Sequence, residues 1–293
     1  MNILFNKIVS STLNISERQV ENTIRLLDEG ATIPFISRYR KEVTGALDEV
    51  QISNVKEQYD KLRELEKRKQ TIITTIGEQG KLTPDLRTRL ENSWNAMEIE
   101  DIYLPYRPKR RTRAEVAREK GLEPLAKILM IQTENNLDIK AQAFVKNDVV
   151  DTEEALKGAR DIIAEWISEN ERARNMVRSI FRKEAIISSR VVKGKEEEAA
   201  KYRDYFDWSE PLRRCSSHRL LAVRRGESEG FLKVSIEPDS ELCIERLEGL
   251  FVKNATASAA QVNEAVRDGY KRLLKPSIET EFAALSKERA DDE

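Results

Sequence analysis

The chain has 293 residues, of which 35% are charged, 39% are hydrophobic and only 11 are glycine. This composition favours long helices with solvated faces, because glycine is unfavourable inside helices and exposed helix faces must be polar. The formal net charge of −1 excludes an overall attraction to nucleic acid or to an anionic membrane, so any such attraction must be local.

The first twenty residues lack the basic and apolar segments of a secretory signal, and no run of 18 apolar residues occurs in the sequence. Cys215 and Cys243 are too far apart for a CxxC motif, which favours a reduced, intracellular protein. We therefore expect a cytoplasmic, monomeric protein without a membrane partner.

Helix signals dominate the first hundred residues. Ser16 and Gln19 form a capping box, and Gly30 suits the end of the helix that they start. Apolar residues then recur every three, four or seven positions over residues 47–77. This period predicts a long central helix packed along one side.

The strongest local charge lies in the segment RPKRRTR at residues 107–113. Prolines before and within the run disfavour a helix there, and Thr112 with Glu115 predicts the start of the next helix. Tyr103 and Tyr106 flank the run and are candidates for stacking on unpaired bases. The five candidate phosphate ligands are Arg107, Lys109, Arg110, Arg111 and Arg113.

Two interpretations of this run remain open. The cations contact nucleic-acid phosphates, or they form a solvated loop whose charges pair with acidic residues inside the protein and brace neighbouring parts of it. A second basic set, Arg174, Arg178 and Arg182, is spaced four residues apart and therefore shares one helical face. That face is either a phosphate track or an ordinary solvated surface.

The sequence after Lys195 changes in character. Residues 220–224 and 231–236 alternate around RGESEG, which predicts a β-hairpin. Pro276 is expected to break the helix that precedes it. Four aromatic residues fit a packed corner better than a base-stacking set, namely Tyr202, Tyr205, Phe206 and Trp208.

Catalytic motifs are missing from the sequence. It contains no phosphate-binding loop, dinucleotide fingerprint, HExxH or GxSxG pattern, and His218 is its only histidine. We interpret His218 as a structural residue, and Glu98, Glu100 and Asp101 as acidic residues near a helix end rather than as a magnesium site. We therefore expect no enzymatic activity, no metal and no cofactor.

The fold class that we predict is mainly α, with one long central helix and one β-hairpin. We expect a helical domain over residues 1–195 and a hairpin-plus-helix connecting region over residues 196–293. Helix-forming sequence continues to the last residue without a cap, so we expect the chain to continue in a longer protein.

Four stretches resemble the Tex family of bacterial transcription accessory proteins. They are TIPFISRYRKEVTGALDE at 32–49, YLPYRPKRRTRAEVAREKGLEPLA at 103–126, YRDYFDWSEPL with SSHRLLAVRRGESEG within 202–230, and DGYKRLLKPSIETE at 268–281. The family is related to a eukaryotic transcription elongation factor that is also a histone chaperone. The resemblance implies the N-terminal, mainly helical region of that family, ahead of a YqgF-like domain of RNase H fold, helix-hairpin-helix elements and an OB-fold RNA-binding domain.

The resemblance implies a part of an RNA-binding transcription accessory protein whose main RNA contacts lie in those later domains. This chain then serves as a scaffold with secondary basic contacts to RNA or another nucleic acid. The alternative is a protein-interaction module that docks on the transcription machinery, or on the rest of its own chain, and contacts no nucleic acid.

Overall fold

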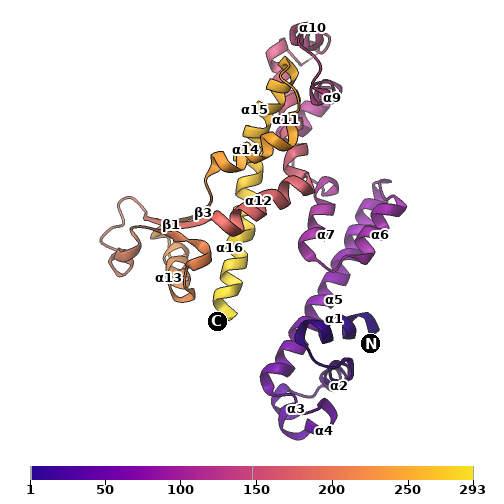
Figure 1. Cartoon of the computed structure of the whole chain (residues 1–293), viewed down its shortest axis with the longest axis vertical. Helices are drawn as coiled ribbons and strands as arrows, with labels where there is room; N and C mark the ends of the chain where they lie inside the picture. The colour runs from indigo at the N-terminus through magenta and orange to yellow at the C-terminus, as the bar shows by residue number, and fades with distance from the viewer. Residues whose placement is uncertain (1, 147, 293) are drawn as a thin grey trace. The chain divides into compact units, whose positions relative to one another are not determined.

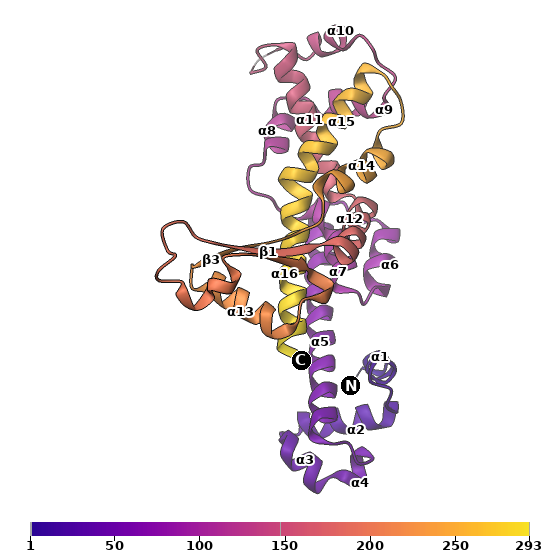
Figure 2. The same cartoon turned by 60° about the vertical axis from the view of Figure 1, so that its left-hand side comes forward.

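The computed structural model describes residues 2–146 and 148–292, and Figures 1 and 2 show it from two sides. The chain divides into two compact units, residues 1–106 and residues 107–293. The structure is mainly α-helical, as predicted, with one small antiparallel sheet. None of the described helices is long and apolar enough to cross a bilayer.

The first unit is built around α5, the long helix that the apolar period predicted. Its N-terminal half packs on α1 and α2 around Ile24, Ile52 and Tyr59, and its C-terminal half packs on α6 and α7 around Ile76 and Ile99. The helices are α1 (Ile3–Leu13), α2 (Glu17–Asp28), α3 (Ile33–Tyr39), α4 (Lys41–Thr44), α5 (Glu49–Glu78), α6 (Pro84–Asn92) and α7 (Ala96–Tyr103), followed by the 3-10 turn η1 (Leu104–Tyr106).

Local capping explains where these helices begin and end. The Ser16 side chain accepts the backbone N–H of Gln19, and the Gln19 side chain accepts the backbone N–H of Ser16, so the predicted capping box is confirmed. Gly30 follows α2 with φ +91°, a conformation that costs little only for glycine. Asp48 and Gln51 form a second capping box at the start of α5.

The second unit is organised around α11, which packs against α8, α9 and α15. Its helices are α8 (Arg113–Glu119), α9 (Glu123–Ile131), α10 (Leu137–Gln142), α11 (Thr152–Glu169), α12 (Glu171–Glu184), α13 (Ser217–Ser228), α14 (Ser240–Phe251), α15 (Ala257–Gly269) and α16 (Lys275–Asp292). The shorter turns are η2 (Ala200–Tyr205), η3 (Leu212–Arg214) and the π-helical η4 (Tyr270–Leu274). Ile162 and Ile163 of α11 are fully buried at the centre of this core.

The sheet corrects the predicted hairpin. Its strands β1 (Ile186–Val191), β2 (Asp207–Pro211) and β3 (Leu232–Glu237) lie in the order β2-β1-β3, all antiparallel. The second predicted strand corresponds to β3, but residues 220–224 lie in α13, beside the sheet in Figure 2. Leu220 and Val223 are both fully buried, and their spacing of three is helical rather than alternating. Gly230, with φ +74°, follows that helix instead of forming a hairpin loop.

Two further expectations from the sequence concern Pro276 and the domain boundary at residue 195. Pro276 does not break the helix, because the wide π turn η4 just before it carries the chain from α15 into α16, with the Lys275 N–H bonded to the Tyr270 carbonyl. The boundary expected at residue 195 lies between β1 and β3, which are paired, whereas the compact units divide after residue 106.

The aromatic residues after β1 form a packed corner, as interpreted from the sequence. The rings of Tyr205 and Trp208 meet edge to face at 5.4 Å between centroids. Tyr202 is 5% exposed and lies beside Phe231. These rings pack against neighbouring rings around the segment between β1 and β2, so their faces are used in internal contacts rather than offered to unpaired bases.

The close approach of α15 to α11, visible in Figure 1, leads to a prediction about two helical glycines. A Cβ at Gly269 would lie 3.1 Å from the Ala164 carbonyl oxygen, whereas a Cβ at Gly249 would meet nothing within 4 Å. We expect Gly269→Ala to lower the free energy of unfolding by about 1–3 kcal/mol. The matched control Gly249→Ala should raise it by about 0.5 kcal/mol, because alanine favours the helix.

Urea denaturation followed by circular dichroism measures both changes. Equal stability gains in the two variants would show that α15 and α11 do not approach each other as closely as the structure has them.

Candidate nucleic-acid interface

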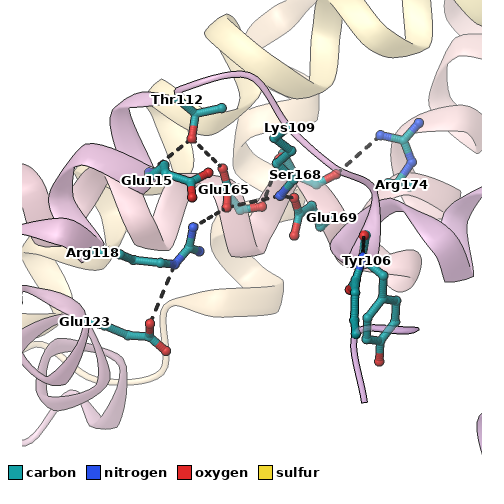
Figure 3. Close-up of polar contacts among 11 residues, drawn as sticks. Tyr106, Lys109, Thr112, Glu115, Arg118, Glu123, Glu165, Ser168, Glu169 and Arg174 are labelled. Carbon is teal, nitrogen blue, oxygen red and sulfur yellow. Dashed lines mark hydrogen bonds and ion pairs between the residues drawn. The ribbon is translucent and has the colours of Figure 1, made fainter. Parts of the chain in front are cut away.

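The basic loop over residues 107–113 leads from the end of η1 into α8. Thr112 caps α8, since its Oγ1 accepts the backbone N–H of Glu115 at 3.0 Å, which confirms the Thr112 half of the capping box expected with Glu115. The same hydroxyl donates to Glu165 of α11 at 3.2 Å. The end of the loop is therefore fixed to α11 as well as to its own helix (Figure 3).

Lys109 is held by two carboxylates of α11. Its ammonium group forms an ion pair with Glu165 at 3.2 Å and donates a hydrogen bond to Glu169. The lysine side chain is only 21% exposed. Figure 3 shows Lys109 directed at these two acids, so this cation braces the loop inside the protein.

Glu165 is the centre of that network. It is buried, and besides Lys109 and Thr112 it accepts a hydrogen bond from Arg118 Nη1 at 2.8 Å. Burial raises the pKa of Glu165, but the hydrogen bond from Arg118 and the charge of Lys109 outweigh this, so its pKa lies below the ordinary value. For Glu169 burial prevails over Lys109, and its pKa is raised. Glu165 is thus the firmly ionised partner.

The arginines of the loop have a different environment. Arg107, Arg110, Arg111 and Arg113 are all exposed. Arg111 reaches Glu119 at 3.3 Å, but both side chains are mostly solvated, so that pair contributes little to stability. Arg110 makes no hydrogen bond or ion pair with any residue that the structure describes. The structure therefore separates one internal lysine from a set of outward-facing arginines.

The two candidate stacking residues belong to the first unit. Tyr103 is 6% exposed, and the Arg68 guanidinium lies 5.2 Å from its ring centroid. Its ring is therefore part of the packed core. Tyr106 is half-buried against the same cluster, and its carbonyl accepts a hydrogen bond from Gln79.

The predicted arginine face on α12 is wrong for two of its three residues. Arg174 and Arg178 are 5% and 4% exposed, and both bind Glu281 of α16. Arg178 is bidentate, with contacts of 2.7 and 2.9 Å, and Arg174 also donates to the Ser168 carbonyl at 3.3 Å. Only Arg182 is exposed. The helical period could not reveal that α16 covers this face.

The two glutamates of the acidic group predicted near a helix end contact neighbouring side chains. Glu100 forms a two-point ion pair with Arg68, at 2.6 and 3.0 Å, and Glu98 accepts a hydrogen bond from Ser93. Over residues 2–146 and 148–292, no group of three or more His, Cys, Asp or Glu side chains is placed to hold a metal ion. His218 lies exposed near the start of α13.

Comparison with known proteins identifies relatives along the whole chain. A model described as Tex central region-like matches residues 132–293, and a model of the Tex-like protein N-terminal domain matches residues 4–77. Protein YhgF of Escherichia coli K12 is 43% identical over 100% of this chain and 40% of its own length. The transcriptional accessory protein Tex of Neisseria gonorrhoeae is 40% identical over 99% of this chain and 39% of its own.

A more distant relative carries a different name. The human S1 RNA-binding domain-containing protein 1 is 27% identical over 98% of this chain and 30% of its own length. The chain thus spans about 40% of the length of its bacterial relatives.

The brace predicts different costs for two neighbouring cations. We expect Lys109→Ala to lower the free energy of unfolding by about 2 kcal/mol, because it leaves two partly or wholly buried carboxylates without their shared lysine. Arg111→Ala, which removes an exposed pair, should change it by less than about 0.5 kcal/mol. Denaturant unfolding at neutral pH measures both values.

The loss in Lys109→Ala should shrink at about pH 4. Without the lysine, the pKa of each carboxyl group rises, so the groups bind protons and become less costly to bury. A loss that is independent of pH would contradict the ionic origin of the brace.

Proposed function

Since the chain belongs to the Tex family of transcription accessory proteins, we propose that it is the N-terminal helical part of a nucleic-acid-binding factor of this kind. Its role is that of a cytoplasmic, non-enzymatic scaffold that adds secondary contacts to RNA. The names of its relatives, a transcriptional accessory protein and an S1 RNA-binding domain-containing protein, support nucleic acid as the class of partner. This chain spans only part of those proteins, so we do not assign their full activity to it.

The observation that carries the proposal is the division of charge in the loop over residues 107–113. Lys109 is neutralised by Glu165 and Glu169, which fixes the path of the backbone. Arg110 projects from that fixed path without a partner among the described residues. An arginine held ready in this way loses little conformational freedom when it binds a phosphate.

The contact is expected to be weak and sensitive to salt. Arg107 and Arg111 have partners within the protein, so if Arg110 and Arg113 each met one phosphate of a single strand, the logarithmic salt slope would be about −1.4. Lys109 does not add to this number because its charge is already matched. Arg174 and Arg178 do not add to it either, since both are buried against Glu281.

A second candidate function is docking of another protein segment on the first unit. A groove of about 550 Å³ lies there between α1, α5 and α7. Its walls include Ile8, Leu62, Leu65 and Trp94. The lining also includes the charged residues Lys61, Glu64, Arg68 and Glu100, so the groove suits an amphipathic helix from the transcription machinery or from the rest of the same protein. This alternative requires no nucleic acid.

We expect Arg110→Ala/Arg113→Ala to weaken binding of a single-stranded RNA oligonucleotide and to flatten its salt slope by about 1.4. The matched control Arg203→Ala/Arg225→Ala removes two exposed arginines elsewhere in the second unit and should leave the slope unchanged. Fluorescence anisotropy over a series of sodium chloride concentrations measures both, and circular dichroism verifies folding.

If the unaltered chain shows no salt-sensitive binding even at low ionic strength, the nucleic-acid role of this loop is refuted. The docking function then remains as the better account of the chain.

A further inference from the structure

A small cavity of about 210 Å³ lies in the second unit, where α12 packs against η3 and α16. Its lining combines three arginines, Arg182, Arg213 and Arg289, with apolar side chains that include Leu212 and Leu285. The cavity is separate in sequence from the loop over residues 107–113 and has no part in the contact proposed there. Arg182 is the one member of the predicted arginine face that α16 leaves exposed.

The three guanidinium groups are not neutralised within the cavity. No carboxylate belongs to the lining. Arg182 and Arg213 are exposed and have no hydrogen-bond or ion-pair partner among the residues that the structure describes. Arg289 donates from Nη2 to the Cys215 carbonyl at 2.8 Å, whereas its buried Nε has no acceptor in the described part of the chain.

One atom of this arrangement favours an added acceptor. Arg289 Nε is buried without a hydrogen-bond acceptor in the described part of the chain, which costs free energy, whereas the charges of Arg182 and Arg213 are solvated because both side chains are exposed. No acidic side chain forms an ion pair with these arginines in the described part of the chain: Glu281 binds Arg174 and Arg178, and Glu210 pairs with Arg219 through Oε2 at 2.6 Å, while its buried Oε1 has no hydrogen-bond partner there. An external anion is therefore the natural complement.

The number of arginines favours phosphate over carboxylate. Elsewhere in this protein, one carboxylate, that of Glu281, is bound by two guanidinium groups. Three guanidinium groups without a carboxylate partner are more than the two that bind the single carboxylate of Glu281. A phosphate has a greater negative charge than a carboxylate and more acceptor oxygens, so it matches three guanidinium groups better. We propose that this cavity binds a phosphate group.

The walls indicate which part of a nucleotide enters. The cavity has the volume of about seven water molecules, enough for a phosphate and part of a sugar. Leu212 and Leu285 offer apolar contact to sugar carbons. Phe282 is 8% exposed and packed against Phe181 at 5.3 Å, so it is not a stacking platform. The site reads the backbone rather than the base. That this backbone belongs to RNA rests on the proposed function, whereas the phosphate site itself does not.

The direct test is a calorimetric titration of the chain with inorganic phosphate, with ionic strength held constant by chloride. The variant Arg182→Ala/Arg213→Ala should bind phosphate at least about tenfold more weakly, because charge-assisted hydrogen bonds are lost. The control Arg203→Ala/Arg225→Ala should bind it as the unaltered chain does. Absence of phosphate binding, or equal binding by the cavity variant and the unaltered chain, would overturn the inference.

Two further probes identify the source of the anion. With single-stranded RNA, the cavity variant should lose affinity in addition to the loss caused by Arg110→Ala/Arg113→Ala. If RNA binding depends on the loop alone while phosphate binding still depends on the cavity, the site serves free phosphate. If polyglutamate binds in a cavity-dependent way and phosphate does not, the site recognises an acidic peptide and the phosphate inference is wrong.

Discussion

One buried carboxylate, Glu165, decides what the basic loop is able to do. It accepts hydrogen bonds from Thr112 and Arg118 and forms an ion pair with Lys109, so it joins the loop, the start of α8 and the end of α11 at one point. A carboxylate in that position needs cationic partners, because burial alone favours its neutral form. The loop path follows from meeting that need, and the remaining arginines face solvent as a result.

The same rule divides the cations throughout the second unit. Where an acid from a distant segment reaches a basic side chain, the cation becomes part of the scaffold, as Glu281 shows with Arg174 and Arg178. Where none does, as at Arg110 and Arg182, the charge stays available to an external anion. A chain with a net charge of −1 can therefore present local positive charge without an overall positive field.

The family membership and this division of charge both bear on the proposed function of the chain. The chain is a Tex-family helical region that spans about 40% of the length of its bacterial relatives. The rigid elements around α11 hold the loop and the arginine-lined cavity on one compact unit. In the two proposals made above, both features contact phosphate groups, which contribute affinity and salt dependence but carry no base sequence.

Local signals in the sequence determined the helical class, the long helix α5 and the caps at Ser16 and Thr112, because a helix period and a cap depend only on residues within one or two turns. Residues 220–224 were misassigned because so short an apolar run satisfies both periods until its packing against the sheet is known. Only the tertiary structure decided which cations are free. The partners of Lys109 lie 56 and 60 residues away along the chain, and that of Arg178 lies 103 residues away. No local pattern encodes contacts that arise from the packing of separate helices.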